Sequence, residues 1–460
     1  TFLEAMALLG TRYFDHPVLK VFQLLFHVVI NLFQTYTGYG YNRYPANEPK
    51  FARKRQHTIL IVDILEVGIN CSFFRSKVID TLHVMFLVNS KARYLGPSTW
   101  LGKSAASLGA GMSLAGLVKF ADRKFREARA VTDQLQDDGL KVFVDFYYVI
   151  SRPYLNRMAE YDQIFYEFLA RAEKLMPIWN VCTILSSHSG FMAWQGRYRE
   201  LADFYARKLY LVDEGKNIGM MSDFRETYAS RLEFLGRKEE AEKMRAEARE
   251  FYKQVQGGNM MARAVHFGVR MHNLVEQGPL FAKETQDVFE GFANVKPVGF
   301  YFQYVYAWTS QWRYLQAHFS TDPAERARYL KLARKNMKTS LKNQKTWLTQ
   351  GLLQTFKAAD ARLSGRLDDV EWFLAKAEEI ASRCDARNTF YYVFVERARL
   401  ARARGNEMRA RIEARAAYEY AASFGWAMRL STLEKEFGAL APVVEPAVVE
   451  TPLVWTASAR

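Results

Sequence analysis

The chain has 460 residues, 49% of them apolar and 25% charged, with only 12 Pro and 26 Gly. This composition provides ample material for a continuous hydrophobic core and leaves long stretches free to be helical, and no segment has the pattern of a sheet. The formal net charge of +15 could attract an acidic partner, but the basic residues are dispersed along the chain, which disfavours a nucleic-acid-binding protein.

The first 74 residues are the most apolar part, and we expect them to form N-terminal helices that pack on the rest. The segment Val18 to Phe33 is shorter than the roughly 20 residues that a membrane span needs. Its polar residues Lys20, Gln23, His27 and Asn31 recur at steps of three or four. We expect them to form the outward stripe of an amphipathic helix that is otherwise buried, with a membrane-surface helix as the alternative. The chain starts with Thr and without a signal peptide, so we expect a piece of a longer protein.

Two segments imitate nucleotide-binding motifs. Gly96 to Ser104 resembles a phosphate-binding loop, but it has five residues between its glycines where the motif needs four, and no β-rich strand precedes it. Ile59 to Asp63 resembles the strand that ends in a magnesium-binding Asp, yet it precedes the supposed loop and continues in helical period to Ile69. We therefore expect no ATP binding and no cofactor.

The cysteines Cys71, Cys182 and Cys384 lie more than a hundred residues apart and lack metal-binding spacing. This pattern predicts small buried apolar residues in a reducing compartment, and hence a cytoplasmic protein. No Ser/His/Asp, paired-carboxylate or zinc-binding constellation is present, so we expect neither a metal site nor an enzyme.

Residues 75–425 contain a repeated unit, which consists of a helix, a short break at Gly or another small residue, and an Ala-rich charged helix. The breaks at residues 196, 236, 278, 320, 365 and 405 are 40, 42, 42, 45 and 40 residues apart. Repetition at this period is typical of solenoids, in which stacked hairpins bury the apolar stripe that one hairpin cannot. The fold class predicted is all-α: a right-handed superhelix (α-solenoid) of antiparallel helical hairpins, degenerate and tetratricopeptide-like.

Two columns of residues support this prediction. Seven residues before the break, four copies have a small side chain that would let the partner helix approach closely: Ser189, Ala229, Ala358 and Ala398. Five residues after it, the same copies have an apolar residue that would face the first helix: Leu201, Ala241, Val370 and Ala410.

The densest basic run falls on the outer helix of one hairpin and the turn after it. It comprises Arg326, Arg328, Lys331, Arg334, Lys335, Lys338, Lys342 and Lys345. A solvated face is the simplest interpretation. Contact with a protein, a peripheral membrane or another anionic surface through basic residues is the alternative.

The stretch from Ala416 to Phe437 resembles the end of the helical-repeat region in large bacterial STAND-type signalling ATPases, where a small-residue turn, a basic residue and a short Leu-Glu helix follow the last hairpin. Ala5 to Gly10 resembles the start of that region. The resemblance implies a tetratricopeptide-like superhelix that usually lies between an AAA-type ATPase and a kinase or cyclase output domain. We expect a terminal capping helix at 426–438 and a flexible Pro/Val/Glu tail at 439–460.

Two functions remain open. The first is a non-catalytic protein–protein interaction scaffold or sensor module of a larger bacterial signalling protein, which binds a partner or peptide on its concave face. By analogy with tetratricopeptide grooves, the partly solvated binding residues would be Asp223, Glu226, Ser230, His272, Ser310, Tyr314 and Arg399. The second is a structural subunit of a large assembly, for instance at a membrane.

Overall fold

The computed structural model describes residues 16–74, 78–254, 260–278, 299–341 and 346–440, together with Glu4 and Gly10. Over these ranges the chain forms nineteen α-helices and three short 3-10 turns and contains no strand, which confirms the predicted all-α class. The N-terminal elements are α2 (Pro17–Thr37), η1 (Pro49–Phe51), α3 (Ala52–Phe74), α4 (Val78–Ala92), η2 (Arg93–Leu95), α5 (Thr99–Leu114), α6 (Val118–Leu135), α7 (Asp138–Ser151) and η3 (Pro153–Leu155). They are followed by α8 (Met158–Leu175), α9 (Ile178–Gln195), α10 (Tyr198–Glu214), α11 (Ile218–Phe234), α12 (Lys238–Gln254), α13 (Met260–Gln277), α15 (Gly299–Phe319), α16 (Pro323–Leu341), α17 (Trp347–Leu363), α18 (Leu367–Ser382), α19 (Arg387–Ala403), α20 (Glu407–Ser423) and α21 (Ala427–Phe437).

Consecutive helices pack in pairs, as in α3/α4, α5/α6, α11/α12, α15/α16, α17/α18 and α19/α20. All six breaks predicted from the sequence lie at the end of a helix. At Gly196 the backbone is left-handed, with φ of 83°, and ends α9 by a bond from its N–H to the carbonyl of Ala193. The positions of the breaks are therefore a local property of the sequence.

The two predicted packing columns are buried. Ser189, Ala229, Ala358 and Ala398 lie inside the molecule, as do Leu201, Ala241, Val370 and Ala410. The small side chains let paired helices approach closely. The first helices α11, α13, α15, α17 and α19 also contact one another in series.

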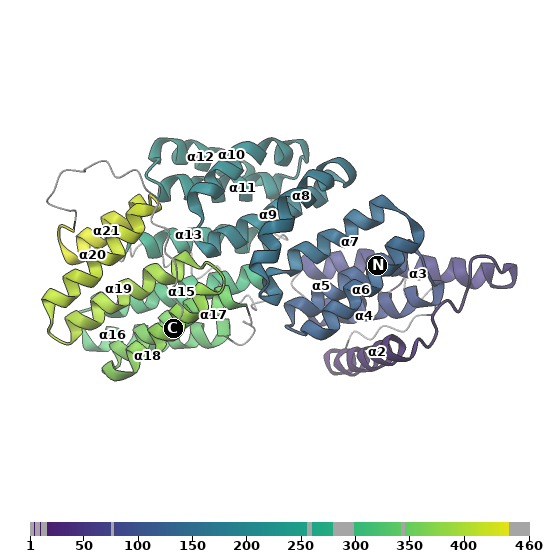
Figure 1. The fold of residues 1–460 in the computed structure, drawn as a ribbon, viewed down its shortest axis with the longest axis horizontal. Helices are drawn as coiled ribbons and strands as arrows, with labels where there is room; N and C mark the ends of the chain where they lie inside the picture. Colours follow the sequence, from purple (N-terminus) through teal and green to yellow (C-terminus); the bar gives the residue numbers. More distant parts are fainter. Residues whose placement is uncertain are drawn as a thin grey trace.

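The helices α17, α19 and α21 turn back onto helices that precede them by more than 150 residues. In Figure 1, α2–α7 form one end of the molecule and α10–α21 the other, with α8 and α9 between them. Helix α9 contacts α17 and α19, and α21 contacts α11 and α13. Asn388 of α19 donates through its Nδ2 to the carbonyls of Ala193 and Trp194 at 2.9 and 3.2 Å, and so adds a donor to two of the last carbonyls of α9. A simple solenoid joins only neighbouring repeats, whereas this array closes on itself.

The polarity predicted for the first described helix is wrong. Asn31 is buried and Lys20, Gln23 and His27 are half-buried, so these residues form the inward face of α2 and not an outward stripe. The helix packs on α4, and most of its apolar residues lie outside. Periodicity reveals the two faces of a helix, but the identity of the inner face depends on the surface it meets. Here that surface offers polar partners.

The segments that resemble nucleotide-binding motifs lie in helices, except for residues 96–98, which precede α5. Residues 59–63 belong to α3, which continues beyond Ile69 as predicted, and residues 99–104 open α5. The Ser98 side chain caps α5 by accepting from the N–H of Leu101.

Cys182 and Cys384 are buried free thiols, as predicted, and burial raises their pKa values to about 11 and about 12. The side chain of Cys71, the lysines Lys342 and Lys345 and the tail from residue 441 lie outside the described residues.

Candidate functional site: a cavity beside two buried ion-pair networks

The seven predicted groove residues lie on first helices, as expected, but most are not solvated. Asp223, Glu226 and Ser230 come from α11, His272 from α13, Ser310 and Tyr314 from α15, and Arg399 from α19. Six of them are buried and Asp223 is half-buried, so the expectation of a partly solvated groove at these positions is wrong. Neighbouring helices of the array cover most of these positions, and α21 also covers Arg399.

Several of these residues bond to neighbouring helices. Ser230 donates to Oδ1 of Asn273 on α13 at 2.6 Å, and Ser310 donates to the carbonyl of Ala333 on α16 at 2.8 Å. Tyr314 donates to Oδ1 of Asp360 on α17 at 3.5 Å, and burial raises the pKa of this phenol. The three side chains thus join one helix to the next.

Asp223 and Glu226 are the acidic members of the predicted groove. Burial raises the pKa of Asp223 well above its usual value, and the charge of Glu226 adds to this effect. Burial also raises the pKa of Glu226, although Arg245 lies 3.9 Å away and acts in the opposite direction. Both carboxyl groups therefore hold their protons more tightly than free carboxyl groups do.

His272 belongs to a network around a buried ion pair. Glu276 of α13 accepts two hydrogen bonds from Arg429 of α21, at 2.7 and 2.8 Å, and both side chains are almost fully buried. Burial alone would raise the pKa of Glu276, but the charge and hydrogen bonds of Arg429 outweigh it and hold that pKa well below the usual range. The pair joins helices whose residues are 153 positions apart in the chain.

The tautomer of His272 follows from its neighbours. Burial lowers its pKa to about 4, so the ring is neutral at pH 7. The guanidinium of Arg231 lies 3.2 Å from Nδ1 and can only donate, so Nδ1 is an acceptor and the proton is on Nε2. That Nε2–H faces Glu276 Oε1 at 3.2 Å and the hydroxyl of Tyr198 at 3.3 Å.

Aromatic rings enclose the guanidinium of Arg429. Its Cζ lies 4.1 Å from the ring centre of Tyr391 and 4.3 Å from that of Trp426, with Phe234 and Tyr392 slightly farther away. Desolvation of a charge is costly, and the two-point contact with Glu276 and the electron-rich ring faces offset that cost.

A second buried network lies along α15, α17, α19 and α21. Arg399 contacts Glu396 at 2.8 Å and holds Glu436 by two bonds of 2.7 and 2.8 Å. Arg362 pairs with Glu396 at 2.9 Å, and Nε2 of His318 lies 3.2 Å from Glu436. Sequence inspection singled out Arg399 but missed its partner Glu436, because that carboxylate belongs to a different helix.

A cavity of about 550 Å³ lies between the two networks. Its walls come from the ends of α13 and α15, the start of α16, and the facing sides of α19 and α21. Charged groups of both networks reach it through Glu276, Arg399 and Glu436. The apolar and aromatic part of its lining comprises Val275, Leu315, Phe319, Tyr329, Tyr391, Tyr392 and Val395.

One polar atom in the wall of this cavity is not satisfied. Gln311 of α15 lines the cavity and is 3% exposed, and its side-chain carbonyl Oε1 is buried without a hydrogen-bond partner. Glu276, Arg399 and Glu436, in contrast, are all paired. A ligand that reached this oxygen with an N–H or O–H group would give it a partner, and the rest of the ligand would pack against the apolar lining.

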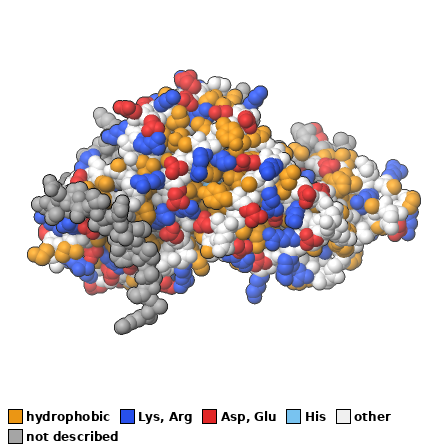
Figure 2. All heavy atoms as spheres, turned by 45° about the horizontal axis from the view of Figure 1, so that its top comes forward, with side chains coloured by type: hydrophobic (Ala, Val, Ile, Leu, Met, Phe, Trp, Pro, Cys, Tyr) orange, Lys and Arg blue, Asp and Glu red, His pale blue; other side chains and the backbone are white. Residues whose placement is uncertain are grey.

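The predicted basic run does not stand out on the outer surface. Figure 2 shows Lys and Arg interspersed with Asp and Glu over the visible face. Within the predicted basic run of α16, the described members Arg326, Arg328, Lys331, Arg334, Lys335 and Lys338 are exposed. Arg334 also pairs with Asp360 at 2.7 Å. Among the described side chains, no group of three His, Cys, Asp or Glu is placed to hold a metal ion.

Comparison of the chain with protein-family models, with curated proteins and with solved structures finds no match.

Proposed function

We propose that the chain is a non-catalytic interaction scaffold or sensor module that binds a peptide segment of a partner in the cavity between α13, α15, α16, α19 and α21. The observation that supports this most is that Gln311, whose buried Oε1 has no hydrogen-bond partner, is one of the residues that line the cavity. A buried acceptor without a donor costs about 1–3 kcal/mol, which a ligand N–H or O–H would recover. The volume of about 550 Å³ lies within the usual size range of ligand sites.

The lining determines the chemistry of the occupant. Glu276 and Glu436 are already paired with Arg429 and Arg399, so the buried charges of the wall are compensated, and the other charged lining residues, Glu325 and Lys435, are exposed. Leu315, Val395 and Tyr391 offer apolar and aromatic surface instead. The best-fitting occupant is a bulky apolar side chain next to a hydrogen-bond donor, as a short peptide provides with its backbone N–H.

We further propose that the helix pairs form a right-handed, tetratricopeptide-like superhelix and that the chain acts as the repeat region of a bacterial STAND-type signalling protein. Two features support this proposal: the break every 40 to 45 residues and the stacking of α11, α13, α15, α17 and α19. In this role the module transmits the presence of a partner to adjoining domains.

Site-specific photo-crosslinking tests the location of binding. A benzophenone amino acid at Phe319, which is exposed at the cavity, should capture the partner in the source cell. The same group at Met408, an exposed residue of α20 outside the cavity lining, is the matched control and should not. Capture at Met408 alone, or equal capture at both positions, would contradict the cavity site.

A pair of substitutions then separates binding from folding. Gln311→Leu and Gln354→Leu each remove a buried, unpaired side-chain carbonyl, but only Gln311 lines the cavity. Both should raise the free energy of unfolding by about 1 kcal/mol, and only Gln311→Leu should weaken binding of the captured partner, by about tenfold. Unchanged affinity in Gln311→Leu would exclude this carbonyl as a ligand contact.

A further inference from the structure

Helix α2 has an inverted polarity. From Val18 to Tyr36 every exposed side chain is apolar or aromatic, including Phe22 (66%), Phe26 (60%) and Val29 (63%). The polar residues of the same helix point inward. A helix on the surface of a water-soluble domain normally presents the opposite arrangement.

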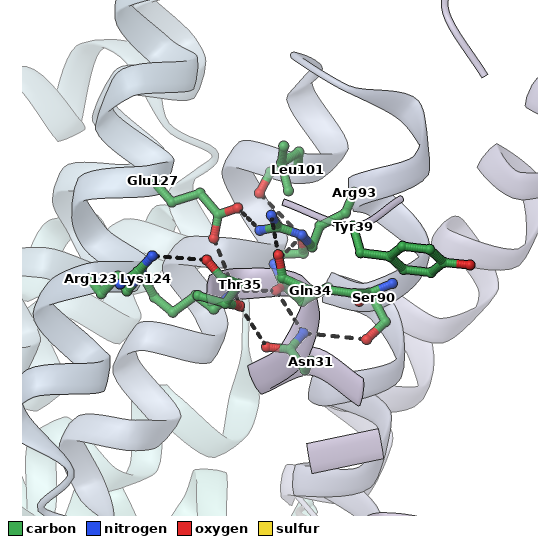
Figure 3. A network of polar contacts seen from close by, with 12 residues as sticks. Asn31, Gln34, Thr35, Tyr39, Ser90, Arg93, Leu101, Arg123, Lys124 and Glu127 are labelled. Carbon is green, nitrogen blue, oxygen red and sulfur yellow. Dashed lines mark hydrogen bonds and ion pairs between the residues drawn. The ribbon is translucent and has the colours of Figure 1, made fainter. Parts of the chain in front are cut away.

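Polar contacts fix this orientation. Asn31 donates to Oδ1 of Asn89 on α4 at 2.9 Å, and the ammonium of Lys124 on α6 donates to the hydroxyl of Thr35 at 2.8 Å. Figure 3 shows Asn31 and Thr35 turned toward this network, in which Arg93 donates to the carbonyl of Gln34. At the other end of the helix, Lys20 pairs with Asp80 of α4 at 3.1 Å. Rolling α2 to bury its apolar face would break all of these contacts, so the face stays outside.

The residues that follow α2 have the composition of a membrane interface. Tyr36, Tyr39 and Tyr41 are exposed at its C-terminal end. Between residues 38 and 57 the sequence carries five basic side chains and one acidic one. The exposed basic residues are Arg43, Lys50, Arg53 and Lys54, of which Lys50 pairs with the single acid, Glu48. Tyr side chains favour the headgroup level of a bilayer, and clustered Lys and Arg favour anionic headgroups.

Among the described helices, α2 is long and apolar enough over Val18–Thr37 to cross a membrane by length and composition. Its inward face, however, is bonded to α4 and α6, so only one face is available to lipid. We propose that α2 lies in the plane of an anionic lipid bilayer, with Phe22, Phe26 and Val29 inserted and the basic segment that follows on the headgroups. This inference goes beyond the cavity function and does not depend on it, because α2 packs chiefly on α4, far from the cavity helices.

Vesicle flotation of the full chain tests the proposal. The chain should float with vesicles of phosphatidylcholine and phosphatidylglycerol and bind pure phosphatidylcholine more weakly. The triple variant Phe22→Ser/Phe26→Ser/Val29→Ser should bind the anionic vesicles at least about tenfold more weakly, because three inserted apolar groups are lost. The matched control, Trp372→Ser/Met408→Ser/Ile412→Ser, removes equally exposed apolar groups from α18 and α20 and should bind like the wild type. Since all six residues are exposed, both variants should keep the wild-type melting curve.

Two charge-reversal variants test whether the basic segment after α2 contacts the anionic headgroups. Arg43→Glu/Arg53→Glu/Lys54→Glu should weaken binding to anionic vesicles, most strongly at low ionic strength, whereas Arg328→Glu/Lys331→Glu/Lys335→Glu on α16 should not. In Phe22→Trp, the emission of the introduced Trp should shift to the blue on addition of vesicles.

The proposal is overturned if the wild type does not bind anionic vesicles, if the α2 serine variant binds them normally, or if the Trp emission stays unchanged. Gel filtration tests whether the apolar face of α2 instead binds a second copy of the chain. A wild-type dimer that the α2 serine variant converts to a monomer, without vesicle binding by either, would assign the face to a second copy of the chain.

Discussion

Each end of the molecule contains buried cations, and two of them, Arg429 and Lys124, are held differently. Arg429 makes a two-point contact with Glu276 inside a cage of aromatic rings and joins α21 to α13. Lys124 donates to two neutral oxygens, those of Thr35 and Asn89, and to one carboxylate, Glu127. The first network closes the C-terminal half on itself, whereas the second fixes the direction in which α2 faces. Buried polar groups thus complete a core in one region and orient an uncovered surface in the other.

The difference also appears in the pKa values of the two cations. Burial acts against the charge of Arg429, but Glu276 outweighs it and raises the pKa of the guanidinium. Burial lowers the pKa of Lys124 to about 8, with Glu127 only partly opposing it. The charge of Arg429 is therefore the better compensated of the two.

The largest effect is expected when the C-terminal network loses its cation. Arg429→Met leaves Glu276 buried without a charged partner and should lower the free energy of unfolding by about 3–5 kcal/mol in urea titrations. Glu276→Gln/Arg429→Met should recover part of this loss because no charge remains buried. A loss of less than about 1 kcal/mol in the single variant would show that the pair does not hold the closed array together.

Overpacking should separate the covered surface from the uncovered one. Ala398→Trp places a large ring in a buried column of the C-terminal half and should cost about 1–3 kcal/mol. Val29→Trp enlarges an exposed residue of α2 and should change the free energy of unfolding by no more than about 0.5 kcal/mol. Equal effects in urea titrations would mean that α2 is covered in solution.

Loss of the Lys124 charge should lower the free energy of unfolding less, and should affect mainly the N-terminal end. In Lys124→Met, Glu127 keeps Arg93 as its partner, so no unpaired charge is created. We expect a cost of about 1–2 kcal/mol and faster proteolysis around α2, while the cleavage pattern of α10–α21 stays unchanged. A loss in free energy of unfolding equal to that of Arg429→Met would show that the two networks contribute equally to the stability of the whole chain.

In their response to acid the two regions should behave alike. Burial lowers the pKa values of His27 and His83 at the N-terminal end, and of His272 in the C-terminal half, to about 4 from the usual 6.5. Each of them binds a proton more weakly in the folded chain than in the unfolded one, so stability falls as the pH drops from about 6.5 toward 4. Each should contribute about 1 kcal/mol of loss between roughly pH 7 and pH 5.5.

Stability measured against pH in His83→Gln and His272→Gln checks this expectation. Each variant should show a flatter pH dependence than the wild type, whatever its stability at neutral pH. A slope that is unchanged in both would mean that these histidines do not control the acid response.

The sequence by itself determined the features that depend on neighbouring residues. The breaks at Gly196, Gly236 and Gly405 were predictable because a glycine ends a helix through its own backbone conformation. The burial of Ala358 and Ala398 was predictable because helix periodicity aligns them with their paired helix. Helix positions and packing columns are therefore encoded locally.

The tertiary structure alone decided which faces are covered. The groove predicted at His272, Tyr314 and Arg399 is buried because neighbouring helices and the returning helices α17, α19 and α21 cover it, and no periodic pattern in the sequence predicts those contacts. Gly196 illustrates the difference: its break was readable from the sequence, but a Cβ there would lie only 2.9 Å from Oδ1 of Asn388, almost two hundred residues later. Likewise, the sequence showed two faces on α2, and only the partners on α4 and α6 determined that the polar face is the inner one. Burial is set by contacts between distant segments, so local pattern gives the elements and long-range packing gives the site.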